Sequence, residues 1–288
     1  MDRLKGKVAV VFGASENNGG AIAHFMAREG ARVCLSDYAA ATATQTRDFL
    51  RGRGYEAESV EADATDEAAV GRVIAECVGR FGRVDALVNM AGKQIRFDVL
   101  DIPLDDWNRQ LASYLTSAML TTKLSARAMA EQGTGGSIIH IASDAAHQGE
   151  PGNSGYSAAK AAVINFSRAA AAELGNRSIR VNTISPTYIE HNLWKYGIEK
   201  ERTPLRATSE DFLRGIPLGR FCRASDVAHA AVFLASDESA FITGCDIPLD
   251  GGARARYWAW MPGNANAVSV HDYARTAKRQ RYGETAED

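Results

Sequence analysis

The chain has 288 residues, of which 45% are hydrophobic and 24% are charged, and its formal net charge is -2. This composition is typical of globular proteins and predicts one large α/β domain. The near-neutral balance gives no electrostatic reason to expect nucleic acid or an anionic membrane as a partner, and no apolar run approaches the length of a membrane span. The N-terminus enters a strand-like run at once, without the apolar segment of a signal peptide, so we expect a cytoplasmic protein.

Four cysteines are scattered along the chain, at Cys34, Cys77, Cys222 and Cys245. None of them stands in a CxxC pair or at a spacing that would join it to a histidine. We therefore expect reduced thiols that pack as small hydrophobic side chains, and we expect no metal site.

The N-terminal segment predicts a dinucleotide-phosphate site. Residues 7–12 (KVAVVF) are typical of a parallel strand buried on both faces, and the helical pattern AIAHFMAREG ends at Gly30. A glycine turn between a strand and a helix can place main-chain amides against a pyrophosphate, although a plain connecting turn is the alternative. The candidate residues of this turn are Gly13, Ser15, Asn17, Asn18 and Gly19.

The second strand, residues 32–36, is followed by Asp37, which lies 24 residues after Gly13. An acid at this point can accept hydrogen bonds from the adenosine ribose hydroxyls and would repel a 2′-phosphate. Tyr38, and not an arginine, comes next. These residues favour NAD over NADP, and the alternative role of Asp37 is to cap the helix predicted over residues 39–51.

Two more strands follow, at residues 57–60 and 84–88. After the first of them, Asp66 is a predicted N-cap for a helix that extends through Arg80. After the second, the chain continues as Asn89-Met90-Ala91-Gly92. A long helical pattern then spans residues 104–130.

The fifth strand, Ile138–Ile141, precedes Ser143, a polar loop and a helix that begins near Ser154. This helix carries Tyr156 and Lys160, and residues four apart share one face. We expect the lysine to lower the pKa of the phenol, because a nearby cation favours the phenolate. The three side chains could then pass a proton to or from a carbonyl or alcohol oxygen, and an ordinary solvated pair is the alternative reading.

The remaining chain predicts a sixth strand at residues 179–184, a mobile polar lid over 192–213, a helix capped by Ser225 or Asp226, and a last strand within ITGCDIPLDGG. Alternating strands and helices indicate an α/β fold: a single doubly wound Rossmann-type domain with a seven-stranded parallel sheet. We expect the order 3-2-1-4-5-6-7, with helices on both faces. We assign residues 1–252 to this domain and 253–288 to an aromatic and charged extension that ends in disordered residues. We expect its first half to pack either on the domain or on a neighbouring subunit, and we favour the neighbour.

The motifs, in this order over residues 5–252, resemble the short-chain dehydrogenase/reductase family. The resemblance implies that Tyr156 is the acid/base, that Ser143 binds the substrate oxygen, and that Lys160 lowers the tyrosine pKa and holds the nicotinamide ribose. Relatives carry a catalytic asparagine at the position of Tyr114, where a main-chain carbonyl helps to hold a relay water. We expect Tyr114 either to relay the proton through its phenol or simply to pack.

The resemblance also implies the rest of a cofactor site. Asp63, with Ala64 beside it, would meet the adenine, and the small residues after the fourth strand would let the ribose approach the backbone. The backbone of the segment after the sixth strand would hold the nicotinamide carboxamide. The implied residues are Asp63, Ala64, Asn89, Ala91, Gly92, Tyr156, Lys160, Pro186, Thr187 and Ile189.

Several positions depart from the family pattern, namely Phe12, Asn17, Met90, Tyr114, Thr187 and His191. Asn17 replaces the middle glycine of the turn, and we expect it to survive there because asparagine tolerates a positive φ. The resemblance implies an NAD-dependent dehydrogenase or reductase that interconverts a secondary alcohol and a ketone, as a homotetramer or dimer. A catalytically silent nucleotide-binding scaffold and a 3-oxoacyl thioester reductase are the alternatives, and elimination without NAD is a lesser one.

The substrate is expected to be small and polar, on the basis of a candidate lining with aromatic walls. Polar and aromatic side chains of this kind suit hydroxylated or anionic molecules better than a hydrocarbon ketone. Any of them could instead be ordinary surface residues. The candidates are Gln94, Arg96, His147, Asn153, Tyr188, His191 and Trp194.

Overall fold

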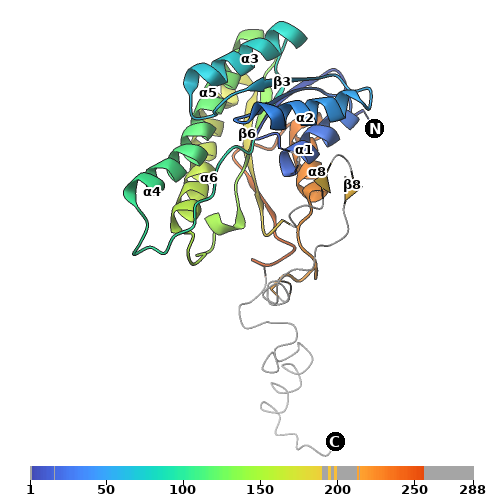
Figure 1. The fold of residues 1–288 in the computed structure, drawn as a ribbon. Coiled ribbons are helices and arrows are strands. Elements are labelled where there is room, and N and C mark those ends of the chain that lie inside the picture. Colours follow the sequence, from blue (N-terminus) through green and yellow to red (C-terminus); the bar gives the residue numbers. More distant parts are fainter. Residues whose placement is uncertain are drawn as a thin grey trace, which may run out of the picture. The chain divides into compact units, whose positions relative to one another are not determined.

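A computed structural model describes residues 2–15, 17–189, 213 and 215–255, together with the backbone of residues 194–195 and 198–199. Seven of its strands form one parallel sheet in the order β3-β2-β1-β4-β5-β6-β9, which confirms the predicted order (Figure 1). The strands are β1 (Val8–Phe12), β2 (Arg32–Asp37), β3 (Ala57–Glu61), β4 (Ala86–Asn89), β5 (Gly136–Ile141), β6 (Ile179–Pro186) and β9 (Asp246–Leu249). The strands β7 (Trp194–Lys195) and β8 (Ile198–Glu199) pair separately and antiparallel.

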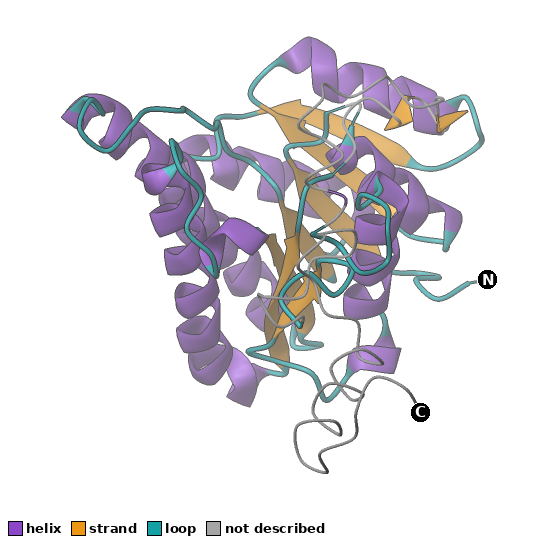
Figure 2. Ribbon diagram, turned by 90° about the horizontal axis from the view of Figure 1, so that it is seen from below, coloured by secondary structure: helices purple, strands orange, loops and turns teal. Residues whose placement is uncertain are grey.

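Helices cover both faces of the sheet, as Figures 1 and 2 show. Helices α1 and α8 supply the apolar side chains on one face, and α3, α5 and α6 supply those on the other. The α-helices are α1 (Asn18–Arg28), α2 (Ala40–Arg51), α3 (Glu67–Phe81), α4 (Leu104–Leu111), α5 (Ser117–Gln132), α6 (Ser154–Leu174) and α8 (Ala224–Ala235). Short 3-10 turns η2 (Asp144–Ala146), η3 (Gly175–Arg177) and η4 (Asp237–Ser239) connect some of them.

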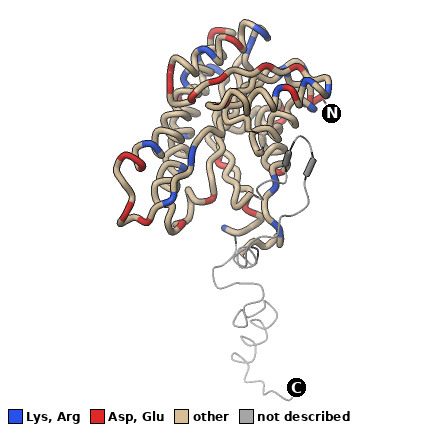
Figure 3. Tube along the Cα trace, in the orientation of Figure 1, with Lys and Arg blue, Asp and Glu red and all other residues tan. Residues whose placement is uncertain are grey.

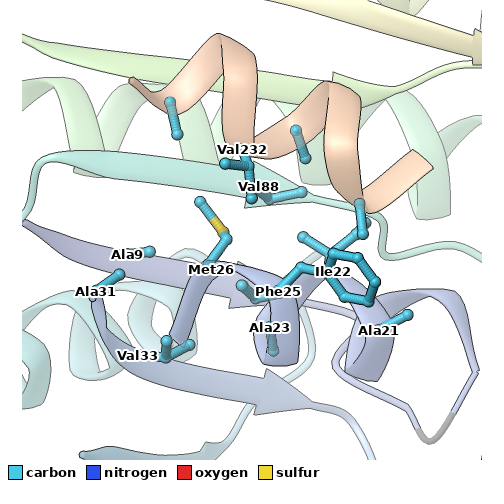
Figure 4. Packing of buried hydrophobic residues seen from close by; sticks show 14 of the residues in the cluster. Ala9, Ala21, Ile22, Ala23, Phe25, Met26, Ala31, Val33, Val88 and Val232 are labelled. Carbon is cyan, nitrogen blue, oxygen red and sulfur yellow. The ribbon is translucent and has the colours of Figure 1, made fainter. Parts of the chain in front are cut away.

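The sheet has an apolar core on each face, because successive side chains along its strands point to opposite faces. In β1, Val8 and Val10 join the cluster under α3 and α5, whereas Ala9 and Val11 join the cluster under α1 and α8. Successive side chains of a strand point to opposite faces, so a strand covered on both sides must be apolar throughout. Figure 4 shows the second cluster at close range, with Met26 of α1 among its buried residues.

The helix predicted over residues 104–130 is interrupted. Between α4 and α5 lies a five-residue π-helical segment, η1 (Ala112–Thr116), and the whole element extends to Gln132. The hydroxyl of Ser117 donates to the carbonyls of Ser113 and Tyr114, over 2.7 Å and 3.0 Å, and so satisfies acceptors in the widened turn. Single π-turns inside α-helices occur frequently at functional sites.

Two predicted helix caps can be compared with the structure. The Asp66 carboxylate accepts from the amides of Ala68 and Ala69 at the start of α3, as predicted. Helix α8 begins after Arg223, and Asp226 accepts the Arg223 amide over 2.8 Å from inside the first turn. Asp226 therefore does contribute to this end of α8, but the N-cap position itself is neither Ser225 nor Asp226.

By its internal contacts the chain divides into two units, 1–203 with 222–249, and 204–221 with 250–288. In the described part of the second unit, the Leu218 amide donates to the Gly251 carbonyl over 3.1 Å, and Arg254 pairs with Asp250. The proposed division at residue 252 stays a prediction. The rest of the extension and most of the expected lid, with His191, lie outside the described residues.

Lys and Arg are interspersed with Asp and Glu along the described chain (Figure 3). None of the described helices combines the length and the apolar character that crossing a membrane requires. Within the same residues, no cluster of three or more His, Cys, Asp or Glu side chains is arranged to hold a metal ion.

The strand order places a switch point between β1 and β4. From β1 the chain adds β2 and β3 on one side, and then β4, β5 and β6 on the other. Phe12 and Asn89, the last residues of β1 and β4, are paired neighbours in the sheet. Ligands of such sheets bind beyond the carboxyl ends of the strands at this point, and the site described next lies there.

Candidate active site

Ser143, Tyr156 and Lys160 are brought together at the end of β5. Ser143 follows β5 in extended backbone and accepts the Ala145 amide over 3.2 Å, which fixes the start of η2. Tyr156 and Lys160 lie in the first two turns of α6, which begins at Ser154 as predicted. The Ser143 hydroxyl lies close enough to the Tyr156 phenol to lower its pKa.

The net pKa of Tyr156 is nevertheless raised, because burial disfavours the phenolate more than Ser143 and Arg96 stabilise it. The expected lowering by Lys160 is therefore not seen in this structure. The lysine ammonium lies 5.6 Å from the centre of the Tyr156 ring, on the side of the aromatic face. Burial, which the sequence pattern does not reveal, sets the direction here.

Lys160 is almost completely buried, with 5% of its surface exposed. Its Nζ donates to the Ile141 carbonyl over 2.6 Å, at the last residue of β5. Burial lowers the pKa of Lys160 from 10.5 to about 7, because a dry environment disfavours the ammonium. The charge of this lysine is thus finely balanced near neutral pH.

Tyr114 lies in η1 and is 7% exposed. Its ring meets the Tyr156 ring edge to face, with 5.2 Å between the ring centres and 78° between the planes. The Lys160 ammonium lies 4.4 Å from the centre of the Tyr114 ring, closer than to Tyr156. Burial raises the pKa of the Tyr114 phenol.

The glycine turn forms a tight cradle after β1. A Cβ atom on Gly13 would lie 2.9 Å from the Ala91 nitrogen, and one on Gly19 would lie 1.9 Å from the Gly13 carbonyl oxygen. Gly20 is a further member that the sequence analysis did not select, since its Cβ would lie 2.6 Å from the Ser15 carbonyl oxygen. The pair of adjacent glycines at positions 19 and 20 is the sequence feature from which Gly20 could have been identified.

Asn17 keeps its place in the turn, but for a different reason than expected. Its φ is -90°, so the turn does not use the positive φ that was the argument for asparagine. Helix α1 already begins at Asn18, and Asn17 precedes it as an ordinary N-cap residue whose side chain makes no capping bond. The first turn of α1 contains no acidic residue, which suits an anion at that helix end.

Asp37 ends β2 and is 8% exposed. Its carboxylate accepts the Ala39 amide over 3.1 Å, and burial raises its pKa although the Ala39 and Tyr38 amides oppose the rise. It is not a helix cap, because Ala39 holds that position for α2 and has no capping side chain. Within the described residues this carboxylate forms no ion pair, so its charge is left to act on a ligand.

Asp63 and Ala64 lie in the loop between β3 and α3. The Asp63 carboxylate accepts both the amide and the hydroxyl of Thr65, over 2.8 Å and 2.7 Å. Ala64 is buried in the cluster under α3. The carboxylate is thus held in place, beside a small apolar residue, at the next strand end after Asp37.

The residues at the end of β4 and just after it pack against the glycine turn. Asn89 accepts the Ala91 amide over 3.0 Å, and its amide donates to the Ser117 hydroxyl over 3.4 Å. Gly92 has a φ of +152°, and a Cβ atom there would lie 2.0 Å from the Tyr114 ring. A turn that only glycine can adopt thus lies directly against the aromatic ring.

Pro186, Thr187 and Ile189 lie at the end of β6. The Thr187 amide donates to the Leu249 carbonyl of β9 over 3.1 Å, and Ile189 forms an isolated bridge with Cys222. The Thr187 amide is therefore used within the protein. The role of this main chain in holding a nicotinamide carboxamide stays a prediction.

The mouth of the site carries an ion pair that includes one residue the sequence analysis missed. Glu150 pairs with Arg96 over 2.9 Å and accepts the Asn153 side-chain amide over 2.8 Å. The charges of Glu150 and Arg96 both act on the pKa of Tyr156, so they lie near the reacting group. His147 is instead directed to Asp246, over 2.8 Å. Tyr188 is exposed, and the Trp194 side chain lies outside the described residues.

The lowered pKa of Lys160 predicts a pH dependence of stability. The unfolded chain holds the lysine proton up to about pH 10.4, whereas the folded chain releases it near 7. Between these values the unfolded state binds more protons, so this lysine makes the free energy of unfolding rise with pH. We expect Lys160→Met to remove that contribution. Urea unfolding of both proteins at several pH values between 7 and 10 measures it, and parallel curves would contradict the prediction.

Residues 13–254 match the family model described as enoyl-(acyl carrier protein) reductase. The chain is 37% identical over 250 residues to the D-threitol dehydrogenase of Mycolicibacterium smegmatis, a match that covers 87% of this chain and 94% of the relative. It is 34% identical over 252 residues to a 3-oxoacyl-[acyl-carrier-protein] reductase of Thermotoga maritima, covering 87% and 98%.

A solved structure gives the same result. The putative short-chain dehydrogenase/reductase of Burkholderia xenovorans superposes with a TM-score of 0.79 at 36% identity, and the match covers 89% of this chain and all of the other. The family match, the relatives and the strand order agree with one another. The chain belongs to the short-chain dehydrogenase/reductase family.

Proposed function

We propose that the protein is an NAD(H)-dependent oxidoreductase that interconverts a secondary alcohol and a ketone on a small polar substrate. The observation that carries this proposal is the meeting of Ser143, Tyr156 and Lys160 at the end of β5, beside a glycine cradle. The arrangement joins a hydroxyl, a phenol and a buried amine at the switch point where such sheets bind ligands.

The residues of the cradle fit a dinucleotide. Glycines 13, 19 and 92 stand where a Cβ atom would clash with neighbouring main chain or with the Tyr114 ring, which keeps these turns close-packed, and the buried Asp37 carboxylate can accept from ribose hydroxyls. When bound, a nicotinamide dinucleotide supplies the position that accepts or donates a hydride. We assign to its binding the cofactor residues named above, with Lys160 toward the nicotinamide ribose.

Tyr156 is the proposed acid/base. In oxidation its phenolate takes the hydroxyl proton of the alcohol while a hydride leaves the carbinol carbon, and in reduction it returns the proton to the carbonyl oxygen. Ser143 donates a hydrogen bond to the same oxygen. A charged Lys160 is proposed to assist by favouring the phenolate. In this structure the groups that oppose the burial-raised pKa of Tyr156 are Ser143 and Arg96.

The substrate we infer is a small hydroxylated molecule. Arg96 and Glu150 offer a donor and an acceptor beside Tyr156, a pairing that suits several hydroxyl groups at once. The related D-threitol dehydrogenase supports this class. The related 3-oxoacyl-[acyl-carrier-protein] reductase favours reduction of a thioester-linked ketone as the second candidate. We place either activity in the cytoplasm.

We expect turnover with small polyols or hydroxyketones, measured as the change in nicotinamide absorbance across a substrate panel that includes a 3-oxoacyl thioester. Tyr156→Phe should lower turnover by about 10²–10⁴-fold while NADH binding persists, because only the proton-transfer group is lost. Tyr55→Phe, outside the site, is the matched control. Turnover of Tyr156→Phe within a few-fold of wild type would place the chemistry elsewhere, and NADH binding without turnover on any substrate would favour the silent scaffold.

We expect NADH to bind more tightly than NADPH by about tenfold or more, because a 2′-phosphate would approach the buried Asp37 carboxylate. Like charges at close range cost on the order of 1 kcal/mol even when well screened. Titration of both cofactors measures the ratio. Asp37→Asn should reduce the preference and Glu131→Gln should leave it unchanged. Equal affinities for NADH and NADPH in the wild-type protein would contradict the assignment of NAD as the cofactor.

We propose a homotetramer or dimer. Helix α6 presents small side chains outward, with Ala158, Ala169 and Ala172 exposed. A surface of this kind lets a second helix approach closely, and a two-fold pairing of identical faces is the commonest way to form an oligomer. Light scattering at micromolar concentration should give at least twice the 31.0 kDa of one chain, whereas a particle of one chain's mass would refute the assembly.

A further inference from the structure

The Tyr114 ring is held in a slot between three elements. On one side lies Gly92, where an added Cβ atom would come within 2.0 Å of the ring atom Cε1 and 2.2 Å of Cδ1. On another side lies Tyr156 of α6, edge to face at 5.2 Å. Tyr114 itself belongs to the π-helical segment η1, and the Ser117 hydroxyl donates a hydrogen bond to the Tyr114 carbonyl. The ring therefore has a fixed position and orientation.

The face of this ring lies against the ammonium of Lys160. The distance from Nζ to the ring centre is 4.4 Å, inside the roughly 6 Å over which an aromatic face attracts a cation. The attraction is stronger where water is excluded, and Lys160 is almost completely buried. The one hydrogen-bond acceptor of Nζ among the described residues is the Ile141 carbonyl. The Tyr114 ring is thus the nearer of two aromatic rings that stabilise the positive charge, the Tyr156 ring lying at 5.6 Å.

The hydroxyl of Tyr114 has no comparable partner. It makes no hydrogen bond to another described residue, and burial raises its pKa, so the phenol stays neutral. Its carbonyl is already engaged by the Ser117 hydroxyl over 3.0 Å. Within the described chain, neither polar group of this residue makes a direct hydrogen bond with Lys160.

From these contacts we infer that Tyr114 is a positioning residue whose ring face keeps Lys160 charged and directed at the end of β5. The inference rests on the proposed function, in which the ammonium assists Tyr156. It differs from a proton relay through the phenol, because the aromatic ring and not the hydroxyl is the active part. Gly92 contributes to the same arrangement, since any side chain at this position would displace the Tyr114 ring.

Three titratable groups lie near the Lys160 ammonium, and the test must separate their titration from that of the lysine. They are the Tyr156 phenol of α6, the Tyr114 phenol of η1 and the imidazole of His140 on β5. Burial, with the charge of Lys160, lowers the pKa of His140 to about 3, so this histidine stays neutral near pH 7. Both phenols have raised pKa values. A transition near pH 7 therefore belongs to the lysine.

The test is a titration of Lys160 followed by NMR of isotope-labelled lysine side chains in the full chain, with the signal assigned through Lys160→Met. Tyr114→Phe keeps the ring and should leave the pKa of Lys160 within a few tenths of a unit of wild type. Tyr114→Leu removes the ring at similar bulk and should lower it by about one unit, equivalent to about 1.4 kcal/mol. Leu115→Ala, which disturbs packing in the same apolar cluster, should not shift it.

Replacing Tyr114 with pentafluorophenylalanine gives a second route that preserves shape and removes the negative face of the ring. It should lower the pKa of Lys160 as the leucine variant does, even where the leucine variant fails to fold. An unshifted pKa in the leucine or fluorinated protein would overturn the inference, and so would an equal shift in Tyr114→Phe. Because this titration needs no substrate or cofactor, it stands apart from the proposed activity.

Turnover adds a second readout. With the proposed substrate class, Tyr114→Phe should keep wild-type turnover and its pH profile, whereas Tyr114→Leu should lose activity as Lys160 loses its charge near neutral pH. A fall of about tenfold in Tyr114→Phe, with the lysine pKa unchanged, would instead assign the phenol a relay role and overturn the assignment to the ring. Absence of turnover in the wild-type protein would contradict the proposed function and leave the titration result intact.

Discussion

A buried amine is the constraint around which the site is built. Lys160 lies beneath the end of β5, almost fully out of water, with its ammonium on one main-chain carbonyl. A dry environment favours the neutral form, so each group that touches Nζ helps to determine how much of the charge survives. The helix that carries the lysine, the strand that accepts its hydrogen bond and the π-helical turn that presents a ring to it must all be in place together.

The parallel sheet explains why these elements meet. Strand β1, buried on both faces, contributes only apolar side chains, whereas β5 and β6 also bury polar ones such as His140, Asn182 and Thr183. The candidate site residues follow the carboxyl ends of the strands. The strand order reverses between β1 and β4. The glycine turn after β1 and the Asn89 turn after β4 are close-packed main chain at this point, with Gly13 against Ala91. The scaffold therefore brings the glycine turn and the group of Ser143, Tyr156 and Lys160 to one edge of the sheet.

Much of this arrangement could be predicted from local patterns, because strand alternation, the Asp66 cap and the start of α6 depend on neighbouring residues. The features that could not be predicted depend on tertiary packing. The direction of the Tyr156 pKa shift is set by burial, and the φ of Asn17 by where α1 begins. Glu150 gains its place at the site through its pairing with Arg96, 54 residues away in the chain, and through the Asn153 side chain.

The orientation of the site residues depends on the number of residues in the π-helical segment. A π-turn holds one more residue than an α-turn, so every side chain after it is rotated relative to a regular helix. Removing one residue between α4 and α5 would restore regular winding and turn the following residues by about 100°. The ring at position 114 and the Ser117 hydroxyl would then no longer face Gly92 and Asn89 together. A single-residue deletion here would thus act on the site as strongly as a substitution within it, while leaving a good helix behind.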